Sequence, residues 1–166
     1  MKKVLVIGTP GSGKTYVSHS LKEKDINAHD ADDIPALGRW IDKKGATFSF
    51  KADADQQWLD RHDFIWDVTW LTQWLSEQTD DVFLFGIASN YLETLPLFDQ
   101  TYCLRVDRNI IARRLRDPSR ENEFGNNEDQ LKNVLNWADQ FYLECSSHNI
   151  IFIDATLSPD EIYKLL

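Results

Sequence analysis

The sequence predicts an α/β protein built around a parallel sheet. Five short apolar runs alternate with helix-like segments along the 166 residues, which is typical of buried strands joined by crossover helices. The first of these runs leads directly into a glycine-rich turn. Hydrophobic residues make up 42% of the chain, enough for the core of one domain of this length. In such sheets ligands bind at the carboxyl ends of the strands, so the residues that follow each strand are candidates for the functional site.

Each element follows from a local pattern. The expected strands are apolar and rich in branched residues: 3–7, 26–30, 82–85, 102–106 and 150–153. Helices are expected over 14–24, 63–78, 109–116, 128–145 and 158–166. The second helix is predicted from Trp66, Trp70 and Trp74, which are spaced four residues apart. The last begins with Ser158 as N-cap, Pro159 at the first position and Glu161 to complete a capping box.

The charge is distributed unevenly along the chain. The net charge is −9, with +4 in residues 1–24, −10 in residues 25–100 and −3 in residues 101–166. An acidic chain repels nucleic acid and anionic membranes, and no apolar run approaches the length of a membrane span. Cys103 and Cys145 lack metal-type spacing and are expected to be free thiols. We therefore expect a cytoplasmic monomer or homodimer that binds neither nucleic acid nor membrane.

The glycine-rich turn is a complete phosphate-binding loop. Its residues, Gly8-Thr9-Pro10-Gly11-Ser12-Gly13-Lys14-Thr15, match G-x-x-x-x-G-K-[ST] between an expected strand and an expected helix. The glycines let backbone N–H groups surround a phosphate, and the helix presents its positive end to the same anion. Lys14 is expected to reach the β- and γ-phosphates of ATP, and the Thr15 hydroxyl to ligate Mg²⁺.

Two further stretches accompany the loop. An acidic stretch, Asp30-Ala31-Asp32-Asp33, follows the second strand, and Arg116…Arg120-Glu121-Asn122-Glu123-Phe124-Gly125 follows the fourth. With these stretches the chain resembles the small P-loop kinase-like ATPases, in the branch of adenylate, shikimate and gluconate kinases. The resemblance implies a three-layer fold, sheet order 2-3-1-4-5, and a single domain over 1–166. It also implies an acceptor-binding segment at about 31–80, a small lid at about 114–128, and transfer of the γ-phosphoryl group of Mg-ATP to a small-molecule acceptor.

The acidic stretch carries the next candidate residues. In the resemblance, one of Asp30 and Asp32 orders the Mg²⁺ hydration shell and the other holds or deprotonates the acceptor hydroxyl, which fits the needs of phosphoryl transfer. Asp32 is the candidate for catalysis and for the metal, together with Thr15. A solvated acidic turn, with Asp33 capping a helix, is the alternative. The third strand ends at Gly86 without an acidic residue, so the metal would rest on Thr15, phosphates, water and Asp32.

Arginines cluster near the expected lid. Six of the eight arginines lie between residues 105 and 120. In the resemblance Arg116 and Arg120 stabilise the transferring phosphoryl group and Arg113 contacts the nucleotide, because guanidinium groups bind phosphate oxygens through two donors. Asn122 and Gly125 would shape the turn of the lid. The alternative for Arg113 and Arg116 is a basic helix end that complements the helix dipole.

The acceptor site is less well defined. The candidates are Asp30, Asp32, Asp33, Arg39, Asp67, Gly86 and Asn90. Arg39 is expected on a short helix-like piece, and the tryptophan stripe is expected in the core or, alternatively, in the wall of the acceptor pocket. The stretch after the third strand lacks the three consecutive glycines of shikimate kinases. The acidic middle favours a neutral, hydroxyl-bearing acceptor or nucleoside over a monophosphate.

Other classes of P-loop protein fit less well. A regulatory GTPase would need guanine-contacting motifs after apolar strands, and the stretches Asp42–Gly45 and Asn126–Asp129 do not supply them. A nucleic-acid-stimulated ATPase or motor is disfavoured by the short, acidic chain. A non-catalytic nucleotide sensor, or a partner in a toxin–antitoxin pair, remains the alternative to a kinase.

Overall fold

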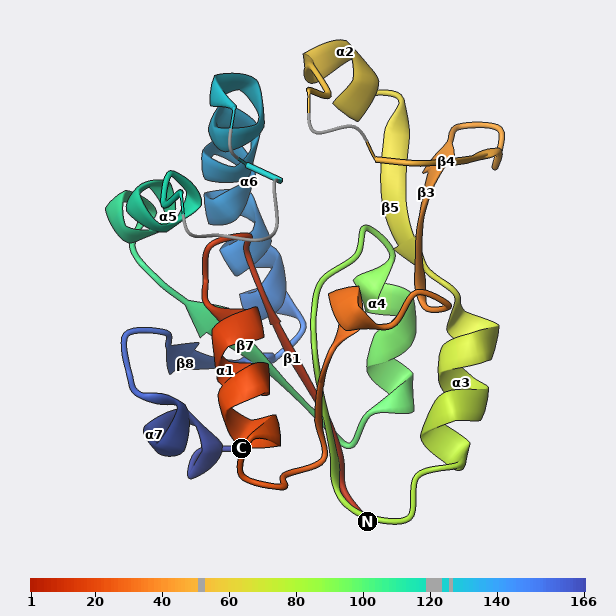
Figure 1. Cartoon of the computed structure of the whole chain (residues 1–166), viewed down its shortest axis with the longest axis vertical. Helices are drawn as coiled ribbons and strands as arrows, with labels where there is room; N and C mark the ends of the chain where they lie inside the picture. Colours follow the sequence, from red (N-terminus) through yellow and green to blue (C-terminus); the bar gives the residue numbers. More distant parts are fainter. Residues whose placement is uncertain (51–52, 119–123, 126) are drawn as a thin grey trace.

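The central sheet is parallel and five-stranded. The computed structural model describes residues 1–50, 53–118, 124–125 and 127–166. The strands are β1 (Lys3–Gly8), β2 (Ala28–Asp30), β6 (Val82–Phe85), β7 (Gln100–Arg105) and β8 (Ile151–Asp154). They lie in the order β2-β6-β1-β7-β8 (Figure 1), and every adjacent pair is parallel. Counted along the chain this is order 2-3-1-4-5, so the predicted fold class and strand order are confirmed.

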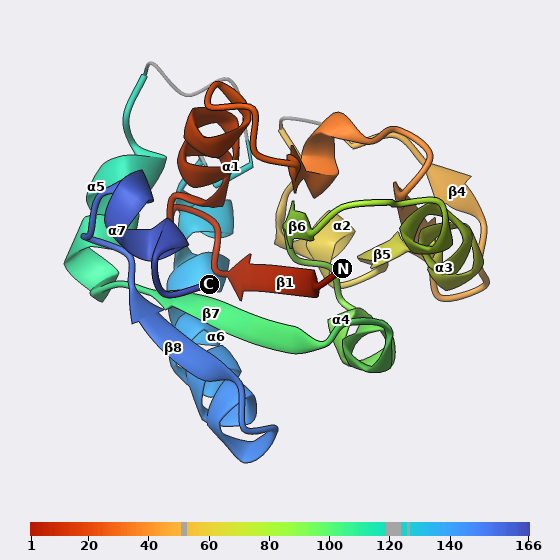
Figure 2. The ribbon, with the colours of Figure 1, turned by 90° about the horizontal axis from the view of Figure 1, so that it is seen from below.

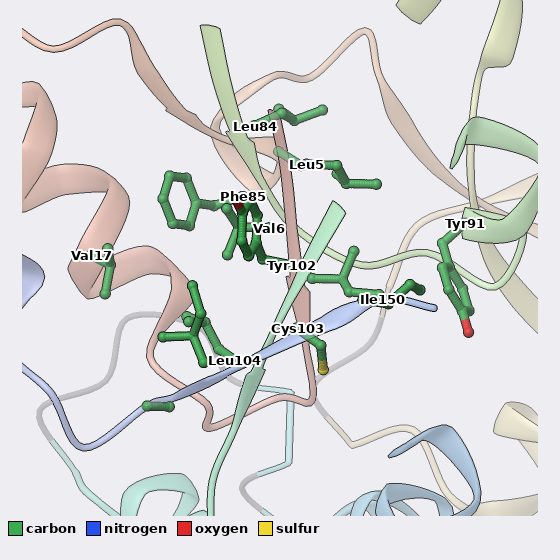
Figure 3. Close-up of a cluster of buried hydrophobic side chains, with 14 of the residues drawn as sticks. Leu5, Val6, Val17, Leu84, Phe85, Tyr91, Tyr102, Cys103, Leu104 and Ile150 are labelled. Carbon is green, nitrogen blue, oxygen red and sulfur yellow. The ribbon is translucent and has the colours of Figure 1, made fainter. Parts of the chain in front are cut away.

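The core is centred on the middle strand. Val4, Leu5, Val6 and Ile7 have no exposed surface, because β1 has a neighbouring strand on each edge and helices on both faces. Phe85 on β6 and Leu104 on β7 are also fully buried. Figure 3 shows Val6, Phe85 and Leu104 gathered beside β1. This buried strand carries the phosphate-binding loop at its carboxyl end, so the loop starts from a strand whose side chains are held by the surrounding core.

Helices cover both faces of the sheet. The helices α1 (Lys14–Lys22) and α7 (Pro159–Tyr163) lie on one face, and α4 (Tyr91–Thr94) and α6 (Glu128–Ser147) on the other (Figure 2). The helix α5 (Arg108–Leu115) follows β7, and short 3₁₀ turns occupy Ala31–Asp33 (η1) and Leu95–Leu97 (η2). The predicted capping box of the last helix is present: Ser158 accepts from the Glu161 N–H, and the Glu161 side chain accepts from the Ser158 N–H.

The segment between β2 and α3 differs from the prediction. This segment contains a second, antiparallel sheet of β3 (Gly38–Asp42), β4 (Thr47–Phe48) and β5 (His62–Trp66), in the order β4-β3-β5, with α2 (Gln56–Leu59) between β4 and β5. The predicted helix from Asp63 is therefore wrong in its first part. The helix α3 (Val68–Ser76) begins only after Asp67, whose carboxylate accepts from the Trp70 N–H as N-cap.

Two predicted placements change with this sheet. Trp66 ends β5 and does not share a helix with Trp70 and Trp74, which stack on each other at 6.1 Å between ring centroids. Arg39 lies on β3 opposite Ile65, and the predicted helix-like piece is wrong. Within the described ranges, no helix combines the length and apolar character that a membrane crossing needs.

The small sheet and the upper part of α6 stand on opposite sides of the central strands. In Figure 1, β3–β5 and α2 lie above the carboxyl end of the parallel sheet on one side, and α5 and the N-terminal part of α6 on the other. The two sides meet through side chains: the buried Gln130 of α6 donates from Nε2 to the carbonyl of Ala54 at 3.0 Å. A cleft lies between them, and its lining includes residues of both sides and of the phosphate-binding loop.

Candidate functional site

A large cleft opens at the carboxyl ends of β1, β2 and β6. Its volume is about 1600 Å³, more than the 300–1,000 Å³ or so that one drug-sized ligand needs. One part is lined by the phosphate-binding loop, α1 and the segment after β8: residues 10–17, His19, Arg114 and 155–159. The other part is lined by η1, the small sheet, the stretch after β6 and α6: Asp32, Trp40, Phe50, Asp63, Phe64, 87–89, Tyr91, Phe124 and Trp137. The cleft therefore has room for two molecules side by side.

The phosphate-binding loop is a tight turn held by its own backbone. The Ser12 N–H donates to the Thr9 carbonyl at 3.0 Å. Gly11 and Gly13 have φ of 79° and 101°, a region that favours glycine, and Gly13 is also the N-cap of α1. Lys14 Nζ donates to the carbonyls of Gly8 at 2.7 Å and Thr9 at 3.1 Å. The ammonium group thus lies against the loop, beside the first backbone N–H groups of α1, where an anion would bind.

Arg114 holds this loop from outside and was not among the predicted site residues. Its Nη1 donates to the carbonyls of Ser12 at 2.8 Å and Gly11 at 3.3 Å, and its Nη2 donates to the Ala155 carbonyl at 3.0 Å. Burial, and then the neighbouring charge of Arg113, lowers the pKa of this guanidinium. The fork of donors joins the loop after β1 to the segment after β8. Its sequence signal is weak: Arg114 lies three residues after the buried Ile111 and so beside the inner face of α5.

The other candidate arginines lie elsewhere. Arg113 is exposed and does not line the cleft. Arg116 is also exposed, lies outside the cleft lining, and pairs with Glu128 through Nη2 and Oε1 at 3.1 Å. Arg120 and Asn122 lie outside the described residues. Gly125 has φ of 93° and donates from its N–H to Gln130 Oε1 at 2.8 Å.

The three aspartates after β2 have different surroundings. Asp30 is 3% exposed, and its Oδ1 accepts from the Asp32 N–H at 2.9 Å as N-cap of η1. Its Oδ2 is buried and meets no donor in the described part of the chain. Asp32 is exposed and lines the cleft. Asp33 turns to the outside and pairs with His19 Nε2 at 2.8 Å. Only Asp32 of the three faces the cleft.

Arg39 and Asp67 pair with each other. Arg39 Nη1 donates to Asp67 Oδ2 at 2.9 Å, and neither residue lines the cleft. Asp67 also caps α3 through the Trp70 N–H, and this bond, followed by the one from Arg39, lowers the pKa of its carboxyl group. Both contacts hold the end of β5 and the start of α3 in place.

Gly86 and Asn90 position the loop after β6. A Cβ at Gly86 would lie 2.5 Å from Ala31 Cβ and 2.7 Å from Trp66 Cζ2, so only glycine lets η1 and Trp66 approach this closely. The Asn90 side chain accepts from the Trp66 N–H at 2.9 Å and donates to the Trp66 carbonyl at 3.0 Å. Neither residue lines the cleft. They hold β5 against the loop of residues 87–89, which does.

An aromatic cluster in the cleft was not predicted. It consists of Trp40, Phe50, Trp58, Phe64 and Phe124, with Trp40 at the centre. All of these except Trp58 line the cleft, and Trp58 packs behind Trp40. The ring centroids of Trp40 and its four neighbours are 4.9–6.2 Å apart. The rings come from β3, the segment before α2, α2 itself, β5 and the stretch before α6. The polar composition of residues 31–62 conceals this cluster, because its members are far apart in sequence and meet only when β3 pairs with β5.

Comparison with known proteins identifies the family of the chain. A family model described as an AAA domain matches residues 4–133. The chain belongs to this AAA-domain family. The match starts in β1 and ends in α6, so it includes the loop, the acidic stretch and Arg114. The predicted resemblance to P-loop kinase-like ATPases is confirmed.

Solved structures of deoxyadenosine kinase from M. mycoides are similar to this AAA-domain chain. The structure with bound dATP is 13% identical, and the alignment covers 98% of this chain and 96% of the kinase chain with a TM-score of 0.48. The structure with the products dCMP and dCDP is 15% identical, and the structure with dCTP is 16% identical. Each alignment covers 98% of this chain and 95% of the kinase chain, with a TM-score of 0.47. No curated protein matches the sequence.

The residues of the AAA-domain cleft suit a nucleotide with Mg²⁺. The loop backbone, Lys14 and the start of α1 form an anion-binding concavity. Thr15 and Asp32, both in the cleft lining, offer the hydroxyl and carboxylate oxygens that Mg²⁺ prefers. Within the described ranges, no three His, Cys, Asp or Glu side chains are grouped as a metal site. A magnesium ion here would thus depend on phosphate oxygens and water as well, which is usual for this metal.

Proposed function

We propose that this protein is a kinase that transfers the γ-phosphoryl group of Mg-ATP to a small-molecule acceptor. The observation that supports the proposal is the extent of the cleft. A complete phosphate-binding loop lines one part, and the adjoining part, which we call the second chamber, is lined by the exposed carboxylate of Asp32. An ATPase without an acceptor has no need of the second chamber. The candidate acceptors are nucleosides, sugar-like hydroxyl compounds and nucleotides.

The nucleotide half holds ATP by its phosphates. Lys14 and the loop N–H groups bind the β- and γ-phosphates, and Thr15 with Asp32 would hold Mg²⁺, which when bound neutralises charge on the phosphates. Arg114 keeps the loop in its binding shape and aligns it with residues 155–157, against which the base of ATP would lie. Positioning of this kind supplies most of the catalysis in phosphoryl transfer.

Asp32 acts on the acceptor side. Its carboxylate accepts a hydrogen bond from the acceptor hydroxyl and orients it toward the γ-phosphorus, or removes its proton as the bond forms. The buried Asp30 fixes the backbone N–H of Asp32 and so determines where that carboxylate lies. Arg116 and Arg120, from the segment of residues 114–128, would stabilise the transferring phosphoryl group when that segment covers the nucleotide. Such arginines contribute about 10³–10⁵ in rate where they act on the transition state.

The test is ADP release with Mg-ATP and panels of nucleosides, nucleoside monophosphates, sugars, sugar acids and vitamins. We expect one class to stimulate ADP release and to become phosphorylated. Asp32→Asn should reduce this acceptor-dependent turnover by about 10²-fold or more and leave ATP binding within about twofold. Asp25→Asn is the matched control, because Asp25 is an exposed aspartate outside the cleft lining. ATP binding without any phosphorylated acceptor would instead support the alternative, a regulatory nucleotide-binding protein.

A further inference from the structure

The second chamber of the cleft is lined by aromatic rings. Trp40, Phe50, Phe64 and Phe124 all border it, and Trp137 adds a ring from α6. Trp40 and Phe50 stack with an interplanar angle of 21° and a centroid distance of 5.5 Å. Trp40 also contacts Phe64 at 5.5 Å and Phe124 at 6.2 Å. The chamber therefore offers flat apolar surfaces from five different segments of the chain: β3, the segment before α2, β5, the stretch before α6, and α6.

These rings are not part of the main core. Trp40, Phe50, Phe64 and Phe124 are each half-buried. Phe64 and Phe124 pack against the buried residues around β1, whereas Trp40 and Phe50 do not. Their remaining surface faces the cleft, where it is in contact with water. Large apolar side chains grouped at a concave surface are characteristic of ligand pockets, since a ligand removes that surface from water. The cluster thus points to a ligand with a flat ring.

The charged groups of this chamber are acidic. Asp32, Asp63 and Glu144 line it together with the imidazole of His62, and Lys14, Arg114 and His19 line the nucleotide part instead. Among the described residues, the second chamber is lined by no lysine or arginine. The lysine next to it, Lys43, is paired with Asp63 at 2.8 Å. An acceptor that carried a phosphate or carboxylate group would be repelled here and would find no guanidinium fork or ammonium group among these residues to bind it.

We propose that the second chamber binds an uncharged acceptor that has a flat ring and a free hydroxyl group. This proposal rests on the proposed function and narrows its acceptor. The ring stacks on the cluster around Trp40, and the hydroxyl meets Asp32 at the boundary with the nucleotide half. Aromatic stacking binds any flat ring, whereas the acidic lining weakens binding of the phosphorylated form of the same compound. The chamber thus distinguishes acceptor from product by charge, which favours release after transfer.

The experiment compares matched pairs that differ in one phosphate. Binding of adenosine and AMP, and of thymidine and dTMP, is measured by calorimetry with the intact protein, with and without a non-hydrolysable ATP analogue and Mg²⁺. Glucose serves as an uncharged compound without a flat ring. We expect at least one nucleoside to bind at least tenfold more tightly than its monophosphate, and glucose not to bind at millimolar concentration.

Two tryptophan variants assign the binding to the cluster. Trp40→Leu keeps an apolar side chain on β3 and removes the ring, so the dissociation constant of the nucleoside should rise at least about fivefold, as expected for loss of a stacking partner. Affinity for the ATP analogue should stay within twofold, which shows that the fold is retained. Trp74→Leu is the matched control, because Trp74 is a half-buried tryptophan on α3 that does not line the cleft.

The outcomes separate this proposal from the proposed function. Tighter binding of the monophosphates, equal binding of glucose, binding of none of the nucleosides, or an unchanged Trp40→Leu variant would each overturn the acceptor class. None of these affects the assignment of the ATP site if the analogue still binds. Conversely, a nucleoside that binds through Trp40 but is never phosphorylated would support the proposed ligand of the second chamber and contradict the proposed kinase activity.

Discussion

At the scale of single residues, one guanidinium group connects two segments of the site. Arg114 is bonded to the carbonyls of Gly11, Ser12 and Ala155, and burial lowers the pKa of its guanidinium. Three carbonyl acceptors around one half-buried cation offset the cost of its desolvation. A lysine has the same charge but cannot reach three carbonyls from one planar group.

Arg114→Lys should therefore weaken ATP binding by about tenfold, or about 1.4 kcal/mol, because the loop loses its connection to Ala155. The measurement is calorimetry with the ATP analogue and Mg²⁺. Arg108→Lys is the control, since Arg108 is half-exposed and paired with Asp139. Equal affinity of wild type and Arg114→Lys would show that the loop holds its shape without this arginine.

Gly86 is the second residue whose identity follows from its contacts. A Cβ there would meet Ala31 and Trp66 at 2.5 and 2.7 Å, closer than packed carbon atoms come. Gly86→Ala should lower the free energy of unfolding by about 1–3 kcal/mol through overpacking. Urea denaturation followed by circular dichroism measures the change. A variant as stable as the wild type would mean that η1 and β5 shift apart without cost.

At the scale of elements, the boundary between β5 and α3 is set by a cap. The tryptophans 66, 70 and 74 show helical spacing, which predicts one helix through all three. The structure starts the helix after Asp67 instead, because the aspartate accepts from the Trp70 N–H and the five residues before it pair with β3. The pairing partner lies more than twenty residues upstream, so local periodicity does not contain it.

This cap predicts a pH dependence. Hydrogen bonds from the Trp70 N–H and from Arg39 lower the pKa of Asp67 below its ordinary value of 3.8. The ionised form is thus favoured in the folded state, and its contribution to stability is complete above the unfolded pKa and lost as pH falls through the folded pKa. Asp67→Ala should cost about 1 kcal/mol at pH 7, and the cost should shrink below about pH 4.

Thermal unfolding of wild type and Asp67→Ala from pH 7 to pH 2 tests this dependence. A cost that is constant over the whole range would show that the carboxylate charge plays no part in the cap. Lys44→Ala, in the exposed turn between β3 and β4, controls for the effect of a surface substitution in the small sheet.

At the scale of the whole molecule, the parallel sheet was predictable and the small sheet was not. Buried parallel strands are continuous apolar runs, and the glycine-rich loop identifies the first of them, so the five strands follow from the chain. The resemblance to small P-loop kinases implies their order. The antiparallel sheet consists of short, half-exposed strands with mixed composition. The same contrast applies to the site: the loop and Asp32 are local signals, whereas Arg114 and the aromatic cluster depend on contacts between distant segments.

Nucleotide binding should stabilise the entire domain. A ligand that binds only the folded state adds about 2.7 kcal/mol at a concentration 100 times its dissociation constant. Mg-ATP should therefore raise the midpoint of thermal unfolding of the wild type, and chelation of Mg²⁺ with EDTA should remove most of the increase. Lys14→Ala should unfold at the temperature of the ligand-free wild type and gain little from Mg-ATP. An equal increase in both proteins would place the nucleotide somewhere other than the loop.

If the two parts of the cleft serve one reaction, the γ-phosphate of ATP must end on an acceptor, and its fate can be traced. Wild type is incubated with γ-labelled ATP, Mg²⁺ and the acceptor panel, and the label is traced by chromatography, with Lys14→Ala in parallel. We expect label on one class of acceptor in the wild type and on no acceptor in Lys14→Ala. Label that appears only as inorganic phosphate, or transfer that persists in Lys14→Ala, would contradict it.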